Sequence, residues 1–210
     1  DAHINTSESK FGGSSVSLDG SGDYLSIPDS DDWNFGSGNF TVDFWANLPT
    51  LSQQASFIGL DESGSNNWQI YWHATQGIKF YLIYGGSSSP YFWQGDTSGW
   101  SINTWYHIAL VRSGDSWKIY RDGTAVASTT SSTTFPDFAS ALLIGNGNQA
   151  EINGYLDELR ISKGVARWTA NFTPPTQEYP TDFVPSGNYT SQIFDAGSSM
   201  SWDTLNWTNT

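Results

Sequence analysis

Apolar and polar residues alternate along most of this chain, and no helical periodicity lasts beyond a single turn. The alternation is clearest at residues 40–47, 68–73, 78–84 and 105–110. A period of two over about 4–8 residues indicates strands with one buried face. Turn residues separate these runs, and Asp122-Gly123 gives the strongest hairpin signal. The sequence therefore predicts an all-β protein of two stacked antiparallel sheets.

Rings can supply the core of such a protein, because 16% of the 210 residues are aromatic. The net charge of −13 disfavours nucleic acids and anionic membranes as partners. No run of about 18 apolar residues occurs, so we expect no membrane insertion. The absence of cysteine excludes disulfides and thiolate metal sites. A cysteine-free chain rich in neutral polar residues is typical of an extracellular or cell-surface protein of microbial or viral origin.

A domain boundary is predicted where four prolines cluster between residues 174 and 185. We expect one sandwich domain at residues 1–180 and a proline-bearing linker with a hairpin at residues 181–210. The hairpin strands would lie at residues 189–194 and 200–207. This hairpin either opens a following module or packs back on the sandwich. A one-turn helix is expected at residues 164–168.

Five segments occur in the order expected of one family. They are FTVDFWAN at 40–47, WYHIALVR at 105–112, IYRDG at 119–123, LLIG at 142–145 and GYLDELRIS at 154–162. Over roughly residues 11–180 the chain resembles the laminin-G-like and pentraxin-like domains of the concanavalin A-like lectin and glucanase superfamily. The resemblance implies a jelly-roll sandwich. It also implies a carbohydrate-binding or adhesion module of a large protein, or alternatively a spacer domain or a domain that binds a protein, such as a surface protein.

Catalysis is not expected from the acidic residues. Related glycoside hydrolases need two carboxylates about 5–5.5 Å apart, which on one strand requires even spacing. Asp157 and Glu158 are adjacent and so should point to opposite faces, while Asp61 and Glu62 fall in a turn. No Gly-x-Ser-x-Gly elbow accompanies the histidines. The sequence therefore predicts a non-enzyme, with a polysaccharide hydrolase or lyase as a further alternative.

A calcium site is predicted from one acidic position. By strand parity, Asp157 shares the core side with Tyr155, Leu159 and Ile161, and a buried carboxylate needs a partner. Arg160 or Arg167 would satisfy it, as would Ca²⁺. The family resemblance implies a structural Ca²⁺ that joins the last strand to a Gly-rich turn near the N-terminus. The predicted metal ligands are Asp19, Asp23 and Asp157.

Pentraxins bind calcium through two loops that correspond here to residues 66–67 and 146–149. These loops carry amides rather than acids, which disfavours a double-calcium site because amides supply no charge.

A glycan or polysaccharide is the expected ligand. Sugars stack their C–H faces on aromatic rings and exchange hydrogen bonds with polar side chains at the rim. Rings and amides interleave between residues 66 and 100, where the segment 85–99 keeps three rings on a polar stretch. Packing in the core is the competing explanation for these rings. The predicted sugar contacts are Asn66, Asn67, Trp72, His73, Trp93, Trp100, Asn146 and Asn148.

Overall fold

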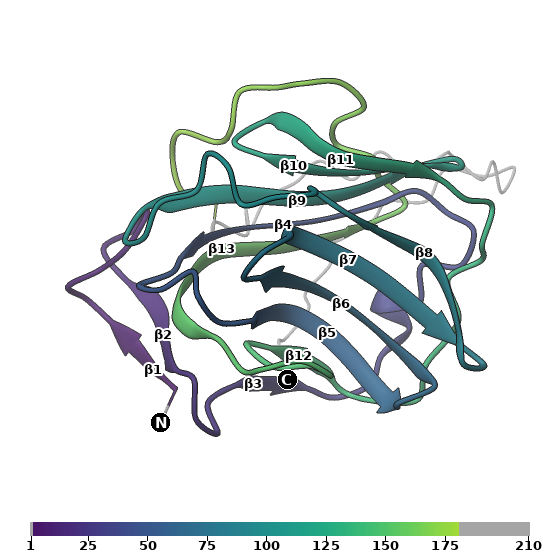
Figure 1. Cartoon of the computed structure of the whole chain (residues 1–210), viewed down its shortest axis with the longest axis horizontal. Helices are drawn as coiled ribbons and strands as arrows, with labels where there is room; N and C mark the ends of the chain where they lie inside the picture. The colour runs from purple at the N-terminus through teal and green to yellow at the C-terminus, as the bar shows by residue number, and fades with distance from the viewer. Residues whose placement is uncertain (1, 181–210) are drawn as a thin grey trace, which may run out of the picture. The chain divides into compact units, whose positions relative to one another are not determined.

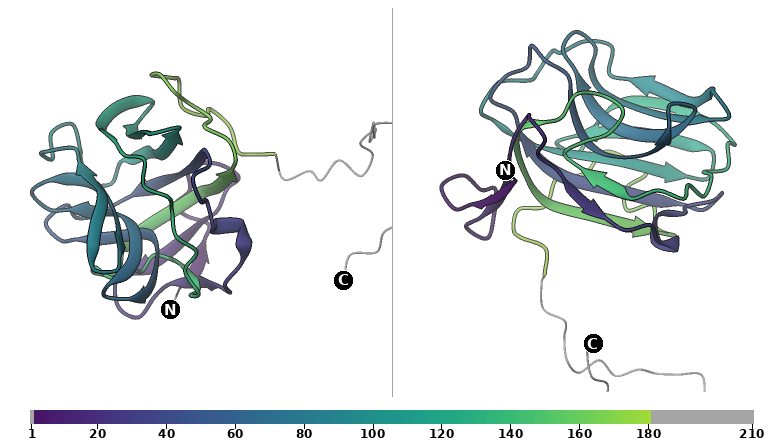
Figure 2. Two further views of the ribbon diagram at one scale, coloured as in Figure 1. Left: turned by 90° about the vertical axis from the view of Figure 1, so that its right-hand side faces the viewer. Right: turned by 90° about the horizontal axis from the view of Figure 1, so that it is seen from below.

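The computed structural model describes residues 2–180 and confirms the predicted two-sheet antiparallel sandwich, seen from three sides in Figure 1 and Figure 2. One sheet has seven strands in the order β1-β2-β13-β4-β9-β10-β11, and the other has six in the order β3-β12-β5-β6-β7-β8. The seven strands are β1 His3–Asn5, β2 Ser15–Asp19, β13 Asn153–Lys163, β4 Phe40–Asn47, β9 Trp105–Ser113, β10 Ser116–Arg121 and β11 Thr124–Thr130. The six are β3 Leu25–Ile27, β12 Leu142–Ile144, β5 Ala55–Ser63, β6 Asn66–His73, β7 Gly77–Tyr84 and β8 Ser87–Trp93.

The sandwich is one compact unit, Asp1–Tyr179, and a second unit begins at Pro180. The predicted linker and hairpin at residues 181–210 lie outside the described residues. Across residues 2–180, no helix is both long enough and apolar enough to cross a membrane.

The predicted helix at residues 164–168 is wrong. Gly164 follows β13 with a φ of 81°, and the next residues take no regular structure. Their backbone is bonded to β4 instead of to itself, because Thr41 Oγ1 donates to Val165 O and accepts from Arg167 N. The helical turn of the described chain is η1, Asp31–Trp33.

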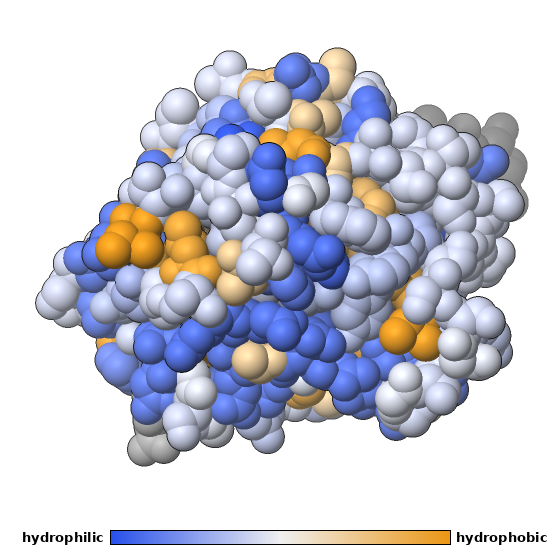
Figure 3. Space-filling view, in the orientation of Figure 1, coloured by the Kyte–Doolittle hydropathy of each residue, from blue (hydrophilic) through white to orange (hydrophobic). Residues whose placement is uncertain are grey.

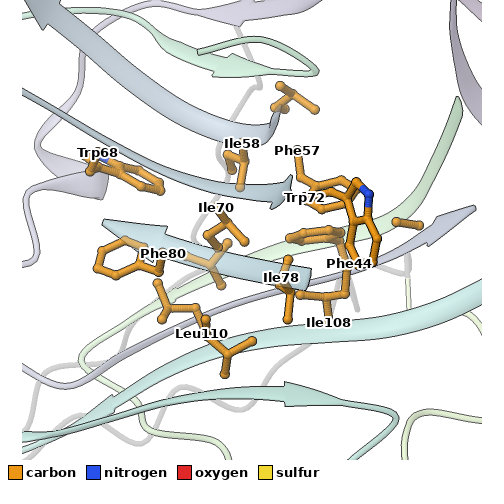
Figure 4. Close-up of a cluster of buried hydrophobic side chains, with 14 of the residues drawn as sticks. Phe44, Phe57, Ile58, Trp68, Ile70, Trp72, Ile78, Phe80, Ile108 and Leu110 are labelled. Carbon is orange, nitrogen blue, oxygen red and sulfur yellow. The ribbon is translucent and has the colours of Figure 1, made fainter. Parts of the chain in front are cut away.

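Large rings and aliphatic side chains fill the space between the sheets (Figure 4). In β4, for example, Phe40, Val42, Phe44 and Ala46 face the core and are at most 2% exposed. The opposite sheet contributes Trp68, Ile70, Trp72, Phe80 and others (Figure 4). Burying each such side chain contributes roughly 1.5–3 kcal/mol, so this core is the main source of stability.

The outer face of the seven-stranded sheet is also covered. The chain that leaves β13 returns over β9 and β10, where it appears in yellow-green in Figure 1. Trp168 and Phe172 of this segment stack at 3.9 Å between ring centroids, and both rings contact His107 edge-on. Ala109, Val111 and Tyr120 lie beneath them in a second, smaller apolar cluster. The outer face of the six-stranded sheet is therefore the candidate face for a ligand.

A β-bulge overturns the predicted parity of β13. Leu156 pairs with Ala46 and faces the core, whereas Asp157 pairs with Trp45 on the outer side. The register then shifts before Arg160, and Glu158 takes a φ of 52°. The inserted residue exchanges the two faces along the strand. Hence Ile161 points inward and Arg160 outward as predicted, while Tyr155 and Asp157 do not face the core.

Candidate ligand-binding face

The strand register arranges polar and aromatic side chains in rows across the outer face of the six-stranded sheet. Core-facing Trp68 and Ile70 of β6 alternate with residues that must point outward. The first row is Gly59, Gln69, Tyr81 and Tyr91; the second is Ser56, Tyr71, Lys79 and Trp93. A third row begins with Asp61 opposite Asn67. Figure 3 views this side of the molecule and shows mainly hydrophilic and intermediate colours over β5–β8.

Part of this outer face is closed by the loop at residues 145–152. The loop is tied to β5 by a bond from Ser56 N to Ala150 O at 2.8 Å. Gly147 lies directly on the sheet, since a Cβ at that position would come within 2.4 Å of Gln69 Oε1. Gln69 is 0% exposed and accepts a hydrogen bond from Ser56 Oγ at 3.2 Å. The loop thus forms one wall of the face and Gln69 its floor.

Three polar atoms on this floor lack hydrogen-bond partners among the described residues: Asp61 Oδ1, Asn67 Oδ1 and Gln69 Nε2. Asn67 donates from Nδ2 to Ser63 O, which leaves its carbonyl oxygen unused. Buried polar atoms without partners cost roughly 1–3 kcal/mol each, so a cluster of them marks a place where a ligand would supply the missing bonds.

Aromatic rings form the other wall of the face. Tyr91 and Trp93 of β8 are 43% and 39% exposed, and their ring centroids lie 5.1 Å apart. Both rings are held by Lys79, whose Nζ lies 4.8 Å and 5.0 Å from their centroids. Exposed rings fixed next to unsatisfied polar groups are the arrangement that sugar binding requires.

Burial and charge shift the pKa values of several groups here. Burial raises the pKa of the Asp61 carboxyl above its ordinary range. Burial also dominates at Tyr81 and raises the pKa of that hydroxyl to about 12. At Tyr91 burial acts in the same direction, but hydrogen bonds from Lys79 and Tyr71 outweigh it and lower the pKa. Burial and hydrogen bonding thus shift the pKa values of Tyr81 and Tyr91 in opposite directions on this face.

Four predicted sugar contacts lie on or beside this face. Asn67 belongs to the floor and Trp93 to the aromatic wall. Asn148 is exposed on the covering loop. Asn146, on the same loop, has a structural role, because its side chain donates to Glu151 Oε1 and accepts from Gly147 N. His73 is half-buried at the end of β6, and burial together with the Lys79 charge lowers its pKa.

The remaining predicted contacts have structural roles. Trp72 is 0% exposed, faces the core and donates to Leu51 O at 3.1 Å, so the prediction that it touches a sugar is wrong. Trp100 packs on the Trp72 ring at 4.8 Å and donates to Gln94 Oε1. Asn66 joins two hairpins by donating to Glu62 and accepting from Gly85 N.

Sequence reasoning missed Tyr71, Lys79 and Tyr81 as members of the face. The signal that identifies them is the alternation of inward and outward side chains along β6 and β7. Once Trp68, Ile70 and Trp72 are assigned to the core, Gln69 and Tyr71 must point outward, and their β7 partners follow. Asp61 lies on β5 and not in a turn, so its partner Asn67 brings it into the face.

The three predicted calcium ligands do not form one site. Asp157 is four residues beyond the partner of Asp19 on β13, which corresponds to about 13 Å along the strand. Its carboxylate instead accepts from Lys10 N at 2.8 Å and Phe11 N at 3.1 Å. In the Gly-rich turn, Asp23 accepts from Asp19 N, and Asp19 accepts from Ser21 N. In residues 2–180, no group of three or more His, Cys, Asp or Glu side chains is placed to hold a metal ion.

A two-sheet antiparallel jelly roll of this kind defines the class of concanavalin A-like β-sandwich domains. A laminin G-type family model of the concanavalin A-like lectin/glucanases superfamily matches residues 19–169. The chain belongs to this superfamily, as its sequence motifs predict. Among curated protein sequences, none matches significantly.

Solved structures of the same fold have low sequence identity to this chain. Domain 4 of AbnA, an extracellular GH43 arabinanase from Geobacillus stearothermophilus in complex with arabinotriose, has a TM-score of 0.61 and 18% identity, over 78% of this chain and 76% of that one. Domains LG4-5 of mouse laminin α1 have a TM-score of 0.55 and 13% identity, over 79% and 47%. The botulinum neurotoxin C1 binding domain has a TM-score of 0.59 and 14% identity, over 77% and 42%. This chain spans less than half of the laminin and toxin chains.

Proposed function

We propose that this domain is a non-catalytic carbohydrate-binding module that acts outside the cell, with its glycan on the outer face of the six-stranded sheet. The observation that carries the proposal is the cluster of unpartnered atoms on Asp61, Asn67 and Gln69 beside the exposed rings of Tyr91 and Trp93. A sugar offers hydroxyl groups to the first set and C–H faces to the second.

Similar structures support a glycan as the ligand class. The arabinanase domain was solved with arabinotriose, and a botulinum neurotoxin DC binding domain was solved with SialylT. Cell entry of botulinum neurotoxin C depends on interaction with two ganglioside molecules. These proteins share the fold of this chain. The unpartnered polar atoms are the feature of this chain itself that supports a glycan ligand.

The absence of catalysis is part of the proposal. The acid on the floor, Asp61, has the amide Asn67 opposite it on the next strand instead of a second carboxylate. A hydrolase of this fold would need two acids at catalytic separation. Release of reducing sugar from polysaccharides that the domain binds would contradict the absence of catalysis but not the binding of glycans.

A glycan array probed with the domain tests the binding function, with hits quantified by calorimetry. We expect at least one glycan class to bind, and we expect Tyr91→Ala and Trp93→Ala to reduce binding. Tyr155→Ala is the matched control, because Tyr155 is a half-buried ring on β13 of the seven-stranded sheet. No binding to any glycan, with or without calcium, would refute the proposal.

Protein binding is the second candidate, and one observation favours it. Ile4 on β1 is 65% exposed and Leu25 on β3 is 38% exposed, and both belong to the edge strands of their sheets. They border a mainly apolar groove of about 220 Å³ that also contacts Leu156. Exposed apolar edges suit protein contacts. A protein partner that the wild type captures and the double variant Ile4→Ser, Leu25→Ser does not would favour this function, provided that the glycan array is negative.

A further inference from the structure

Cations are scarce on the candidate face. Along β5–β8 and the loop at residues 145–152, Lys79 is the only lysine or arginine. A protein that recognises a carboxylate or sulfate ordinarily presents an arginine fork or a free ammonium group to it. The state of Lys79 therefore decides whether this face suits an anionic sugar.

Lys79 is held within the protein by two hydrogen bonds and three rings. Its ammonium group donates to Gln76 Oε1 and to Tyr91 OH, both at 2.7 Å. The same nitrogen lies 4.8, 5.0 and 5.4 Å from the ring centroids of Tyr91, Trp93 and Tyr71. Three rings around one cation form an aromatic cage, and Lys79 is 3% exposed inside it. Its charge fixes the aromatic wall and is not presented to solvent.

The unsatisfied groups that remain are mainly acceptors. Asp61 and Asn67 are partners across β5 and β6, and each has a free Oδ1. Directly paired side chains have Cβ atoms roughly 4.5–5.5 Å apart, so adjacent hydroxyl groups of one sugar can donate to both oxygens. The two Oδ1 atoms are themselves buried, while part of the Asp61 side chain is exposed, so the ligand approaches along Asp61. Hydroxyl donors satisfy such a pair, whereas a ligand anion is repelled by the Asp61 carboxylate.

We infer that the ligand is a neutral glycan whose hydroxyl groups donate to Asp61 and Asn67, and that this face rejects sugars that carry carboxylate or sulfate groups. The inference rests on the proposed function and narrows its ligand class. The net charge of −13 acts in the same direction, because it repels anionic polymers over distance.

The test compares neutral and acidic glycans of matched backbone. The probes are arabinan, xylan and galactan against polygalacturonate, a sulfated galactan and a sialylated oligosaccharide. We expect affinity for a neutral member, at least tenfold weaker binding of its acidic counterparts, and little change between about 50 and 500 mM salt. Asp61→Asn should weaken neutral binding about tenfold, because the hydrogen bond loses its charge. Asp115→Asn, an exposed acid on the β9–β10 turn, is the matched control.

The two proposals fail differently. Preferential binding of acidic glycans, strengthened by Asp61→Asn, would overturn the neutral-ligand inference and leave the carbohydrate-binding function intact. Neutral binding that Asp61→Asn leaves unchanged would remove Asp61 from the site and overturn the inference as well. No binding in either group would refute the function itself. Circular dichroism of the variants separates any of these results from misfolding.

Discussion

Asp43 and Arg160 form a two-pronged ion pair on the outer face of the seven-stranded sheet. Arg160 Nε lies 3.1 Å from Asp43 Oδ1, and Nη2 lies 3.0 Å from Oδ2. Tyr179 OH and His107 Nε2 also bond to Asp43 Oδ2, and the guanidinium lies 3.8 Å from the Tyr179 ring centroid. Asp43 is 0% exposed. This cluster holds Tyr179, at the end of the sandwich unit, against β4 and β13, and it gives His107 a hydrogen-bonded structural role.

The Asp43 cluster predicts an acid-sensitive stability. Burial alone would raise the pKa of Asp43, but bonds from His107, Arg160 and Tyr179 lower it below its usual 3.8. A lowered pKa stabilises the fold above the unfolded value, and this stabilisation is lost as pH falls below about 3.8. Asp43→Asn should cost roughly 1.5–3 kcal/mol at pH 7, because the buried acceptor loses its charge while Arg160, whose side chain is 24% exposed, keeps access to water. Urea unfolding of both proteins at several pH values measures the effect. A gap between them that stays constant down to pH 2 would contradict it.

The two-sheet fold could be predicted from the sequence because apolar–polar alternation and turn residues determine strands and hairpins locally. The structure has strands and turns at these positions. The parity of β13 could not be predicted, because Glu158 inserts a bulge that carries no marker such as glycine at that position. That single residue moved Asp157 to the outer side and removed the basis of the three-acid calcium site. The candidate face was predicted in part. Asn67 and Trp93 were named, whereas the cage around Lys79 depends on pairing between β6, β7 and β8.

Trp72 and Trp93 should respond to mutation in opposite ways. Trp72→Phe removes a bond to Leu51 O and opens a small cavity, so we expect a loss of about 1–3 kcal/mol in unfolding free energy. For a domain of this size each kcal/mol lowers Tm by about 2–4 °C. Glycan affinity, measured by calorimetry well below Tm, should stay within about twofold of the wild type. Equal stability of Trp72→Phe and wild type would show that this indole is not the core element described.

Trp93→Ala should weaken glycan binding about tenfold or more and lower Tm by at most a few degrees, because its ring is 39% exposed on the proposed ligand face. Calorimetric titration and thermal unfolding of the same preparation give both quantities. Unchanged affinity together with an intact fold would exclude the β8 rings from the binding surface.

Asp157 should stabilise the domain without calcium. Its carboxylate accepts from the backbone of Lys10 and Phe11 and so anchors the N-terminal loop to β13. Asp157→Asn should therefore cost about 1.5–3 kcal/mol, by the usual strength of bonds to a charged acceptor. The loss in Tm should be the same in calcium and in EDTA. Asp29→Asn, at an exposed acid, serves as the control. A loss seen only in calcium would restore Asp157 as a metal ligand.

Gly147 sets how closely the covering loop approaches the candidate face. A Cβ there would meet Gln69 Oε1 at 2.4 Å and Ser56 Oγ at 3.5 Å. Gly147→Ala must therefore displace the loop or the buried Gln69 amide, at a cost of roughly 1–3 kcal/mol for overpacking. We expect glycan affinity to change by about fivefold or more, because the floor of the site moves with Gln69. Gly64→Ala is the matched control, since a Cβ at Gly64 meets nothing within 4 Å. If both variants bind glycan like the wild type while Gly147→Ala loses stability, the loop covers the sheet without shaping the ligand site.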